Sequence, residues 1–207
     1  GKVLADNNKT QLRIAETEKY AHITYFFNGL KEKPFPNEYR VLIPSRSLVH
    51  IDEFPEMMAS AITERALVAL NESGFDFILL NYANPDLIAH TGNYDATLKA
   101  VKKTDEEIGR LAKTALSQNH ILIITSDHGN AEELINLRTG EPETKHDISP
   151  VPFYLIAKEF EKKEPMPENY RLPIIGILSD VAPTILNLMK LPVPKEMTGQ
   201  NLLEQLI

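Results

Sequence analysis

Hydrophobic and polar positions alternate along the chain in blocks that indicate strands separated by helices. Five short apolar runs have the length and composition of β-strands. They are HITYFF (22–27), YRVLIP (39–44), FDFILLN (75–81), HILIIT (120–125) and VPFYLIA (151–157). The last three are apolar almost throughout, which predicts strands that are buried on both faces.

Three further segments predict helices. The first extends from Pro55 to Glu72 and the second from about Tyr94 to Gln118, and both repeat apolar residues at helical spacing. The third extends from Asp180 to Met189 and has Pro183 in its first turn, where a missing N–H costs little. A segment rich in Lys, Glu and Pro (158–172) is expected to be an exposed loop.

Buried strands that alternate with helices predict an α/β fold, a three-layer α/β/α sandwich with a mostly parallel sheet. In such sheets, functional side chains collect in loops beyond the carboxyl ends of the strands. Two of the predicted strands end in polar segments of this kind. FDFILLN continues into YANPDLIAHTGN, and HILIIT continues into SDHGN.

The composition excludes several classes of protein. The chain has 207 residues, a net charge of −7 and no cluster of Lys and Arg, so a nucleic-acid partner has little support. It contains no cysteine, which excludes disulfides and thiolate metal sites. Its apolar runs are too short to span a membrane. We expect a soluble protein located in the cytoplasm, with neither nucleic acid nor membrane as a partner.

Carboxylates and imidazoles occur at three places next to predicted strands. Asp86 and His90 are four residues apart and would share a face of a helical turn. Asp127 and His128 follow one strand directly, and His146 precedes another. Carboxylate and neutral imidazole are ligands that Mn²⁺, Zn²⁺ and Fe²⁺ accept. The convergence of three segments predicts a metal site at the edge of the sheet.

Simpler interpretations exist for the same residues. An Asp and a His at this spacing often occur together by chance. Asp127 would serve equally well as the cap of a helix that begins near Asn130, with Gly129 making the turn. The remaining histidines are interpreted as structural or solvated, and they are His22, His50 and His120.

Five segments carry a further signal, and they are RIAETEKYAHITYFFNG (13–29), NYANPDLIAHTGN (81–93), ITSDHGNAEEL (124–134), TKHDISPVPF (144–153) and DVAPTILNLMKLPVPKEMTGQNLL (180–203). In order and rough spacing they resemble a known family, the cofactor-independent (2,3-bisphosphoglycerate-independent) phosphoglycerate mutases of the alkaline phosphatase superfamily. The resemblance covers nearly the whole chain and implies an alkaline phosphatase-like fold.

The resemblance implies two divalent metal ions, usually manganese. One would be bound by Asp86, His90 and His146. The other would be bound by Asp127 and His128 together with an Asp and a Ser from elsewhere, so that this site is incomplete in the chain. On this interpretation, the strand that ends at residue 125 delivers its Asp-His pair to a metal ion.

The resemblance also gives Lys19 a catalytic and substrate-binding role near the transferred phosphate. The family moves phosphate between the 2- and 3-hydroxyls of glycerate through a phosphoserine. A metal ion lowers the pKa of the serine hydroxyl, and a lysine adds positive charge where the phosphoryl group is held. The alternative interpretation of Lys19 is a Glu-Lys pair on a helix surface.

Residues 1–207 depart from the family chiefly in what they lack. They correspond to the C-terminal part of the metal-binding phosphatase-like domain, without its N-terminal part or the inserted phosphotransferase domain. The nucleophilic serine is therefore expected outside this chain, which alone should be inactive. An open sheet edge should also favour self-association or binding of the N-terminal half. Smaller departures leave every ligand in place, and they are Ala89, Lys145 and Asp147.

Two other functions remain open at this point. The first is another metal-dependent phosphatase or phosphomutase of the same superfamily, such as a phosphopentomutase-like protein, although ETEKYAH argues against it. The second is a catalytically dead interaction module that has kept the fold. Metal affinity and complementation would separate an interaction module from an enzyme.

Overall fold

The computed structural model describes residues 1–161 and 173–206 of the chain. Its strands are β1 (Gln11–Glu16), β2 (Glu38–Ile43), β3 (Phe77–Leu80), β4 (Leu122–Thr125) and β5 (Phe153–Ile156). Its α-helices are α1 (Lys2–Asp6), α2 (Thr17–Ala21), α3 (Ala59–Glu72), α4 (Asn84–Ala89), α5 (Tyr94–Ser117), α6 (Val181–Leu188) and α7 (Leu203–Leu206). Shorter helical turns are His22–Phe26, Ile51–Glu53, Lys158–Phe160 and Leu178–Asp180.

The strands form two sheets. In the first, β1 lies between β2 and β3, and both neighbours run parallel to it. In the second, β4 and β5 pair in antiparallel fashion. The parallel sheet is as predicted, whereas the antiparallel β4–β5 pair was not specified by the pattern of the sequence.

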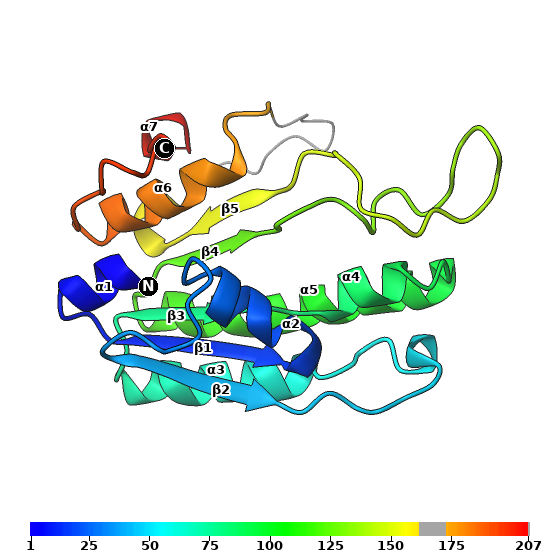
Figure 1. Cartoon of the computed structure of the whole chain (residues 1–207), viewed down its shortest axis with the longest axis horizontal. Coiled ribbons are helices and arrows are strands. Elements are labelled where there is room, and N and C mark those ends of the chain that lie inside the picture. Colours follow the sequence, from blue (N-terminus) through cyan, green and yellow to red (C-terminus); the bar gives the residue numbers. More distant parts are fainter. Residues whose placement is uncertain (162–172, 207) are drawn as a thin grey trace.

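Helices cover both faces of the parallel sheet. Figure 1 shows α2 in front of the sheet and α3 and α5 behind it. The main hydrophobic core lies on the α3 and α5 side, where Leu12 and Ile14 of β1 pack with Ile62 and Ala66 of α3 and Leu111 of α5. This arrangement of a parallel sheet with helices confirms the predicted α/β class.

Most of the predicted elements occur in the structure, with ends that differ by a few residues. Helix α3 begins at Ala59 and not at Pro55, because residues 55–58 form turns. Helices α5 and α6 confirm the other two predicted helices. In the predicted loop 158–172, Lys158–Phe160 form a 3₁₀ turn and residues 162–172 lie outside the described part of the chain.

In residues 11–27, one predicted strand is wrong and one observed strand was missed. HITYFF is not a strand, because His22–Phe26 form a π-helix that continues α2. The strand of this region is β1, which the sequence pattern missed although every residue in it is buried. Strands β3, β4 and β5 were predicted to be fully buried. Their residues are instead half-buried, except for two positions that are exposed.

The two sheets leave strand edges without a partner in the described residues. Strand β3 pairs with β1 on one side, and β4 pairs with β5 on one side. The expectation that a further segment or a second copy covers such an edge stays a prediction, which light scattering at several concentrations would check. Within residues 1–161 and 173–206, no helix combines the length and apolarity needed to cross a bilayer.

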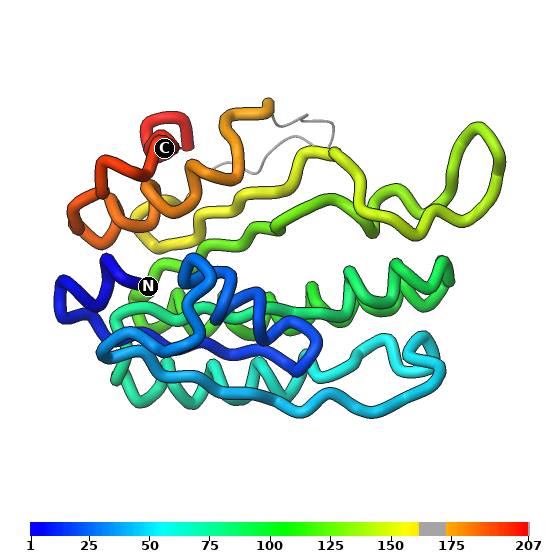
Figure 2. Tube along the Cα trace, in the orientation of Figure 1, coloured from blue at the N-terminus to red at the C-terminus, as the bar shows by residue number. Residues whose placement is uncertain are grey.

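The carboxyl ends of β1, β3 and β4 lie at the same end of the molecule. Helix α2 follows β1 there, and helix α4 follows β3. The segment between β4 and β5 extends beyond this end of the sheets, as the tube in Figure 2 shows. Polar side chains from all these segments meet there, as the sequence predicted for an α/β sheet.

Candidate metal centre

Helix α4 places Asp86 and His90 on one face. The helix begins with Pro at its first turn, where no N–H is needed, and His90 is its C-terminal cap residue. The i, i+4 spacing brings His90 Nε2 to 3.1 Å from Asp86 Oδ1. The predicted helical turn is therefore confirmed.

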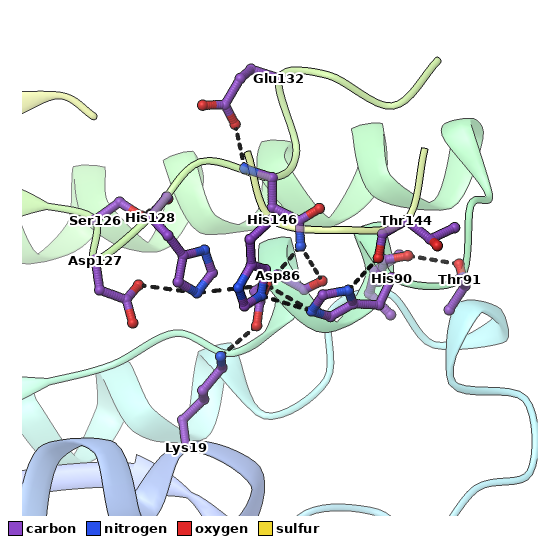
Figure 3. A network of polar contacts seen from close by, with 12 residues as sticks. Lys19, Asp86, His90, Thr91, Ser126, Asp127, His128, Glu132, Thr144 and His146 are labelled. Carbon is purple, nitrogen blue, oxygen red and sulfur yellow. Dashed lines mark hydrogen bonds and ion pairs between the residues drawn. The ribbon is translucent and has the colours of Figure 1, made fainter. Parts of the chain in front are cut away.

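His146 completes a triangle of metal-ligating atoms with this pair. Its Nε2 lies 3.2 Å from Asp86 Oδ1 and 3.0 Å from His90 Nε2. Donor atoms bound about 2.0–2.2 Å from one transition-metal ion leave about 3–3.5 Å between neighbours. The three edges of the triangle have this length, so Asp86, His90 and His146 fit one shared ion. Figure 3 shows the three side chains converging.

The tautomer of His90 supports this assignment. His90 Nδ1 lies 2.7 Å from the carbonyl oxygen of Thr144, which can only accept a hydrogen bond. Nδ1 therefore carries a proton, and Nε2 is the ring nitrogen that faces Asp86 and His146. Metal-ligating histidines are commonly held in this way by a backbone carbonyl behind the ring.

Asp86 is the residue that connects the cluster. Its Oδ2 accepts a hydrogen bond from the Lys19 ammonium, and its Oδ1 accepts one of 2.7 Å from Asn130 Nδ2. Burial raises the pKa of the Asp86 carboxyl, but the hydrogen bonds from Lys19 and Asn130 and the charge of Lys19 outweigh burial. The net effect is a pKa below the ordinary value, so this carboxylate is charged near neutral pH.

Lys19 lies inside the structure and not on a helix surface. The side chain of this α2 residue is 8% exposed and forms an ion pair with Asp86. The alternative of a Glu-Lys pair on a helix surface is therefore wrong. Helix α2 instead directs a buried ammonium group at the proposed metal ligands, as Figure 3 shows.

The Asp127-His128 pair lies beside the triangle but does not complete a second one. His128 Nε2 is 3.6 Å from Asp127 Oδ1 and 4.0 Å from Asp86 Oδ1. The His128 ring stacks on His146, with ring centroids 3.6 Å apart. Its Nδ1 is buried without a hydrogen-bond partner among the described residues. The predicted role of this pair as part of a second metal site stays a prediction.

The interpretation of Asp127 as a helix cap is wrong, because the residues after it form turns and bridges and not a helix. The backbone bends at residues 127–128, and Gly129 does not adopt a positive φ. A Cβ at this position would lie 2.2 Å from Asp147 Oδ1 and 2.7 Å from Glu132 Oε1. Asp147 pairs with Gly129 through the backbone and accepts a hydrogen bond from the Ser149 N–H.

The structure also locates groups around the cluster that the sequence left open. Ser126, the serine nearest to the predicted ligands, donates its hydroxyl to the His128 carbonyl oxygen at 2.8 Å.

Asn130, which lies in the SDHGN segment, was missed as a contributor to the site although it contacts Asp86. Its position two residues after a predicted ligand was the available signal. The described metal-ligating group includes none of His22, His50 and His120.

Fold and site together define an α/β protein with a candidate metal-binding group, and comparison with known proteins agrees with this class. The model of the family described as the Metalloenzyme superfamily matches residues 1–193. The chain therefore belongs to the metalloenzyme superfamily.

Within this superfamily, the chain is similar to 2,3-bisphosphoglycerate-independent phosphoglycerate mutases. That of Clostridioides difficile (strain 630) is 48% identical over 205 residues, which are 99% of this chain and 39% of the relative. That of Gracilaria tenuistipitata var. liui has the same identity and coverage. A crystal structure of Leishmania mexicana phosphoglycerate mutase at low cobalt concentration has a TM-score of 0.81 and 27% identity, and covers 95% of this chain and 38% of that one.

These relatives confirm the resemblance to the cofactor-independent phosphoglycerate mutases and the fold class. The chain spans about 39% of the length of these two curated relatives.

Proposed function

We propose that the chain is the metal-binding portion of a phosphoglycerate mutase, an isomerase that interconverts 2- and 3-phosphoglycerate through a phosphoserine. The observation that carries this proposal is the triangle formed by Asp86, His90 and His146. The mutase relatives, which match 98% or more of this chain, supply the reaction. We propose the cytoplasm as the location and phosphoglycerate as the substrate of the intact enzyme.

Two divalent ions, which we propose to be Mn²⁺, would be held here. Asp86, His90 and His146 would bind one, and Asp127 and His128 would supply part of the other site. Bound ions would lower the pKa of a coordinated serine hydroxyl and neutralise charge on the phosphoryl oxygens. The structural relative crystallised with cobalt supports a divalent ion but does not identify it.

Lys19 would act on the phosphoryl group directly. Its ammonium carries three N–H groups, and Asp86 accepts a hydrogen bond from one of them. The other two N–H groups of this positively charged ammonium remain available at the carboxyl end of β1, where a phosphoryl group could be held. Helix α2 and the ion pair with Asp86 hold this charge in place before substrate binds, which is the condition for electrostatic stabilisation of a transition state.

The nucleophilic serine is proposed to come from outside residues 1–207. Ser45 donates its hydroxyl to the Glu16 carboxylate at 2.9 Å, and Ser126 donates to a backbone carbonyl. Neither hydroxyl is described in contact with Asp86, His90 or His146. The chain alone is therefore expected to show no mutase turnover, even with Mn²⁺ in excess.

Calorimetry with Mn²⁺ on the purified chain tests this proposal. We expect the wild-type chain to bind Mn²⁺ and His90→Ala to lose more than about 10²-fold in affinity, because even residues behind the ligands are worth about 10–100-fold. His50→Ala is the matched control, since it removes an exposed histidine outside the cluster. Equal Mn²⁺ binding by wild type and His90→Ala would contradict the assignment, and mutase turnover by the chain alone would contradict the missing serine.

A further inference from the structure

We propose that Asn130 is a positioning residue that fixes the Asp86 carboxylate for metal binding. By doing so it would tie the segment that carries Asp127 and His128 to helix α4. This inference rests on the proposed metal site and adds a residue that the resemblance did not assign.

Asn130 contacts Asp86 at two points. Its side-chain amide nitrogen lies 2.7 Å from Asp86 Oδ1 and 3.3 Å from the Asp86 backbone carbonyl oxygen. The residue is 4% exposed, so water does not compete well for these hydrogen bonds. Because one amide group donates hydrogen bonds to both the side chain and the backbone of Asp86, it restrains the rotation of the carboxylate as well as its position.

Asn130 is itself held in place by its own segment. Its backbone N–H donates to Glu132 Oε2 at 2.8 Å. It follows Gly129, whose backbone pairs with Asp147 next to His146. Asn130 therefore connects the Asp86 carboxylate to the two segments that supply the remaining histidines of the cluster.

The arrangement of hydrogen bonds determines which oxygen of Asp86 would face a bound ion. Oδ2 is occupied by the Lys19 ammonium, and Oδ1 faces His90 and His146. The Asn130 amide uses one acceptor direction of Oδ1 and leaves another free, because a carboxylate oxygen has two. Asn130 thus holds Asp86 in the orientation in which a single oxygen completes the triangle.

Removing this amide should loosen the ligand without removing it. We expect Asn130→Ala and the bulkier Asn130→Leu to lower Mn²⁺ affinity by about 10–100-fold, the range for groups that orient metal ligands. Calorimetry on the metal-free chain, with circular dichroism to verify folding, provides the measurement.

Asn84→Ala is the matched control for loss of a buried amide. Asn84 is also buried and lies on α4, but its Nδ2 donates to the Ala100 carbonyl oxygen at 2.9 Å and not to Asp86. It should lower the melting temperature at least as much as Asn130→Ala while leaving Mn²⁺ affinity within about threefold of wild type. Equal losses of affinity in both variants would reduce Asn130 to a structural residue and overturn the proposal.

A second measurement keeps the proposal testable if the Asn130 variants fail to fold. In the metal-free chain, Asp86→Asn should shift the NMR signals of the Asn130 side-chain amide, and unchanged signals would overturn the contact. The result also separates this inference from the proposed function. If His90→Ala abolishes Mn²⁺ binding while both Asn130 variants bind as wild type does, the metal site stands and only the role of Asn130 fails.

Discussion

Two Asp-His pairs lie side by side in this molecule, and they differ in how the backbone presents them. Asp86 and His90 belong to helix α4, and their ligand atoms are 3.1 Å apart. Asp127 and His128 are neighbours in an irregular segment, and His128 Nε2 lies 3.6 Å from Asp127 Oδ1. The side chain of Asp86 is 14% exposed, whereas that of Asp127 is 57% exposed.

The difference follows from backbone geometry. Residues four apart on a helix lie above one another on one face, so the helix itself aims both side chains at one point. Adjacent residues in the bend at 127–128 are not aligned on one face by the backbone in this way. His128 accordingly turns toward His146, while Asp127 faces solvent. A pair on one helix can thus supply most of a metal site, with His146 as the third ligand. A pair of adjacent residues needs more ligands from elsewhere.

Removing Lys19 should have the largest effect on function, because its ammonium contacts Asp86 of the helix-borne pair. Lys19→Ala, made in a longer phosphoglycerate mutase that carries this segment, should lower turnover by about 10²–10³-fold, the cost of losing one preorganised electrostatic group. The measurement is steady-state turnover with Mn²⁺ in excess. Lys19→Arg is the control that keeps the charge. Wild-type turnover in Lys19→Ala would leave the buried ion pair with a structural role alone.

Acidification should weaken the contact between α3 and α5, which lies outside both pairs. Glu107 on α5 is buried. Burial raises its pKa, but hydrogen bonds from Lys103, Ser60 and Arg110 outweigh burial and lower it to about 2. A lowered folded-state pKa stabilises the fold above the ordinary value of about 4.3, and this contribution is lost as the pH falls toward 2.

Glu107→Gln tests how much the charge of Glu107 stabilises the fold. The variant should be less stable at neutral pH by on the order of 2 kcal/mol, and the difference from wild type should shrink between about pH 4.5 and pH 2. Urea unfolding across this range provides the measurement. Glu64→Gln is the control, because that glutamate also contacts Arg110 but is exposed. A difference that is independent of pH would show that the charge of Glu107 is not what stabilises the contact between α3 and α5.

The smallest effect should come from the exposed member of the loop-borne pair. Asp127→Asn should change the Mn²⁺ affinity of the site formed by Asp86, His90 and His146 by less than about threefold, because an exposed carboxylate outside this triangle adds only screened attraction. Calorimetry beside His90→Ala gives the direct comparison. A loss as large as that of His90→Ala would mean that the two pairs share one ion, and the contrast between them would disappear.

The sequence was informative where apolar residues follow a simple period. The long helix α5 and the strands β2, β3, β4 and β5 were predicted nearly at their observed positions. The i, i+4 spacing likewise predicted the contact between Asp86 and His90. Each of these predictions depends on residues close in sequence, for which helix and strand geometry leaves few alternatives.

Strand β1 was missed because its buried side chains are not apolar. Gln11, Arg13 and Glu16 are almost completely buried, so the run QLRIAE lacks the pattern of a central strand. The structure accommodates them through distant contacts, such as the Arg13 guanidinium lying 4.1 Å from the centre of the Phe27 ring. Burial lowers the pKa of Arg13 to about 10. No local period reveals partners of this kind, and the same is true of the contact from Asn130 to Asp86.

The backbone bridge between Gly129 and Asp147 has a consequence for how the sequence can vary. It closes residues 130–146 into a loop whose two ends are held together. A second bridge, between Ile135 and Pro142, lies closer to the tip of this loop. Doubling the length of a flexible loop adds only about 0.6 kcal/mol of closure entropy. Beyond the second bridge, insertions and deletions near Gly140 should therefore accumulate freely during divergence. A side chain at residue 129 would instead displace the carboxylates of Asp147 and Glu132, which lie against this position.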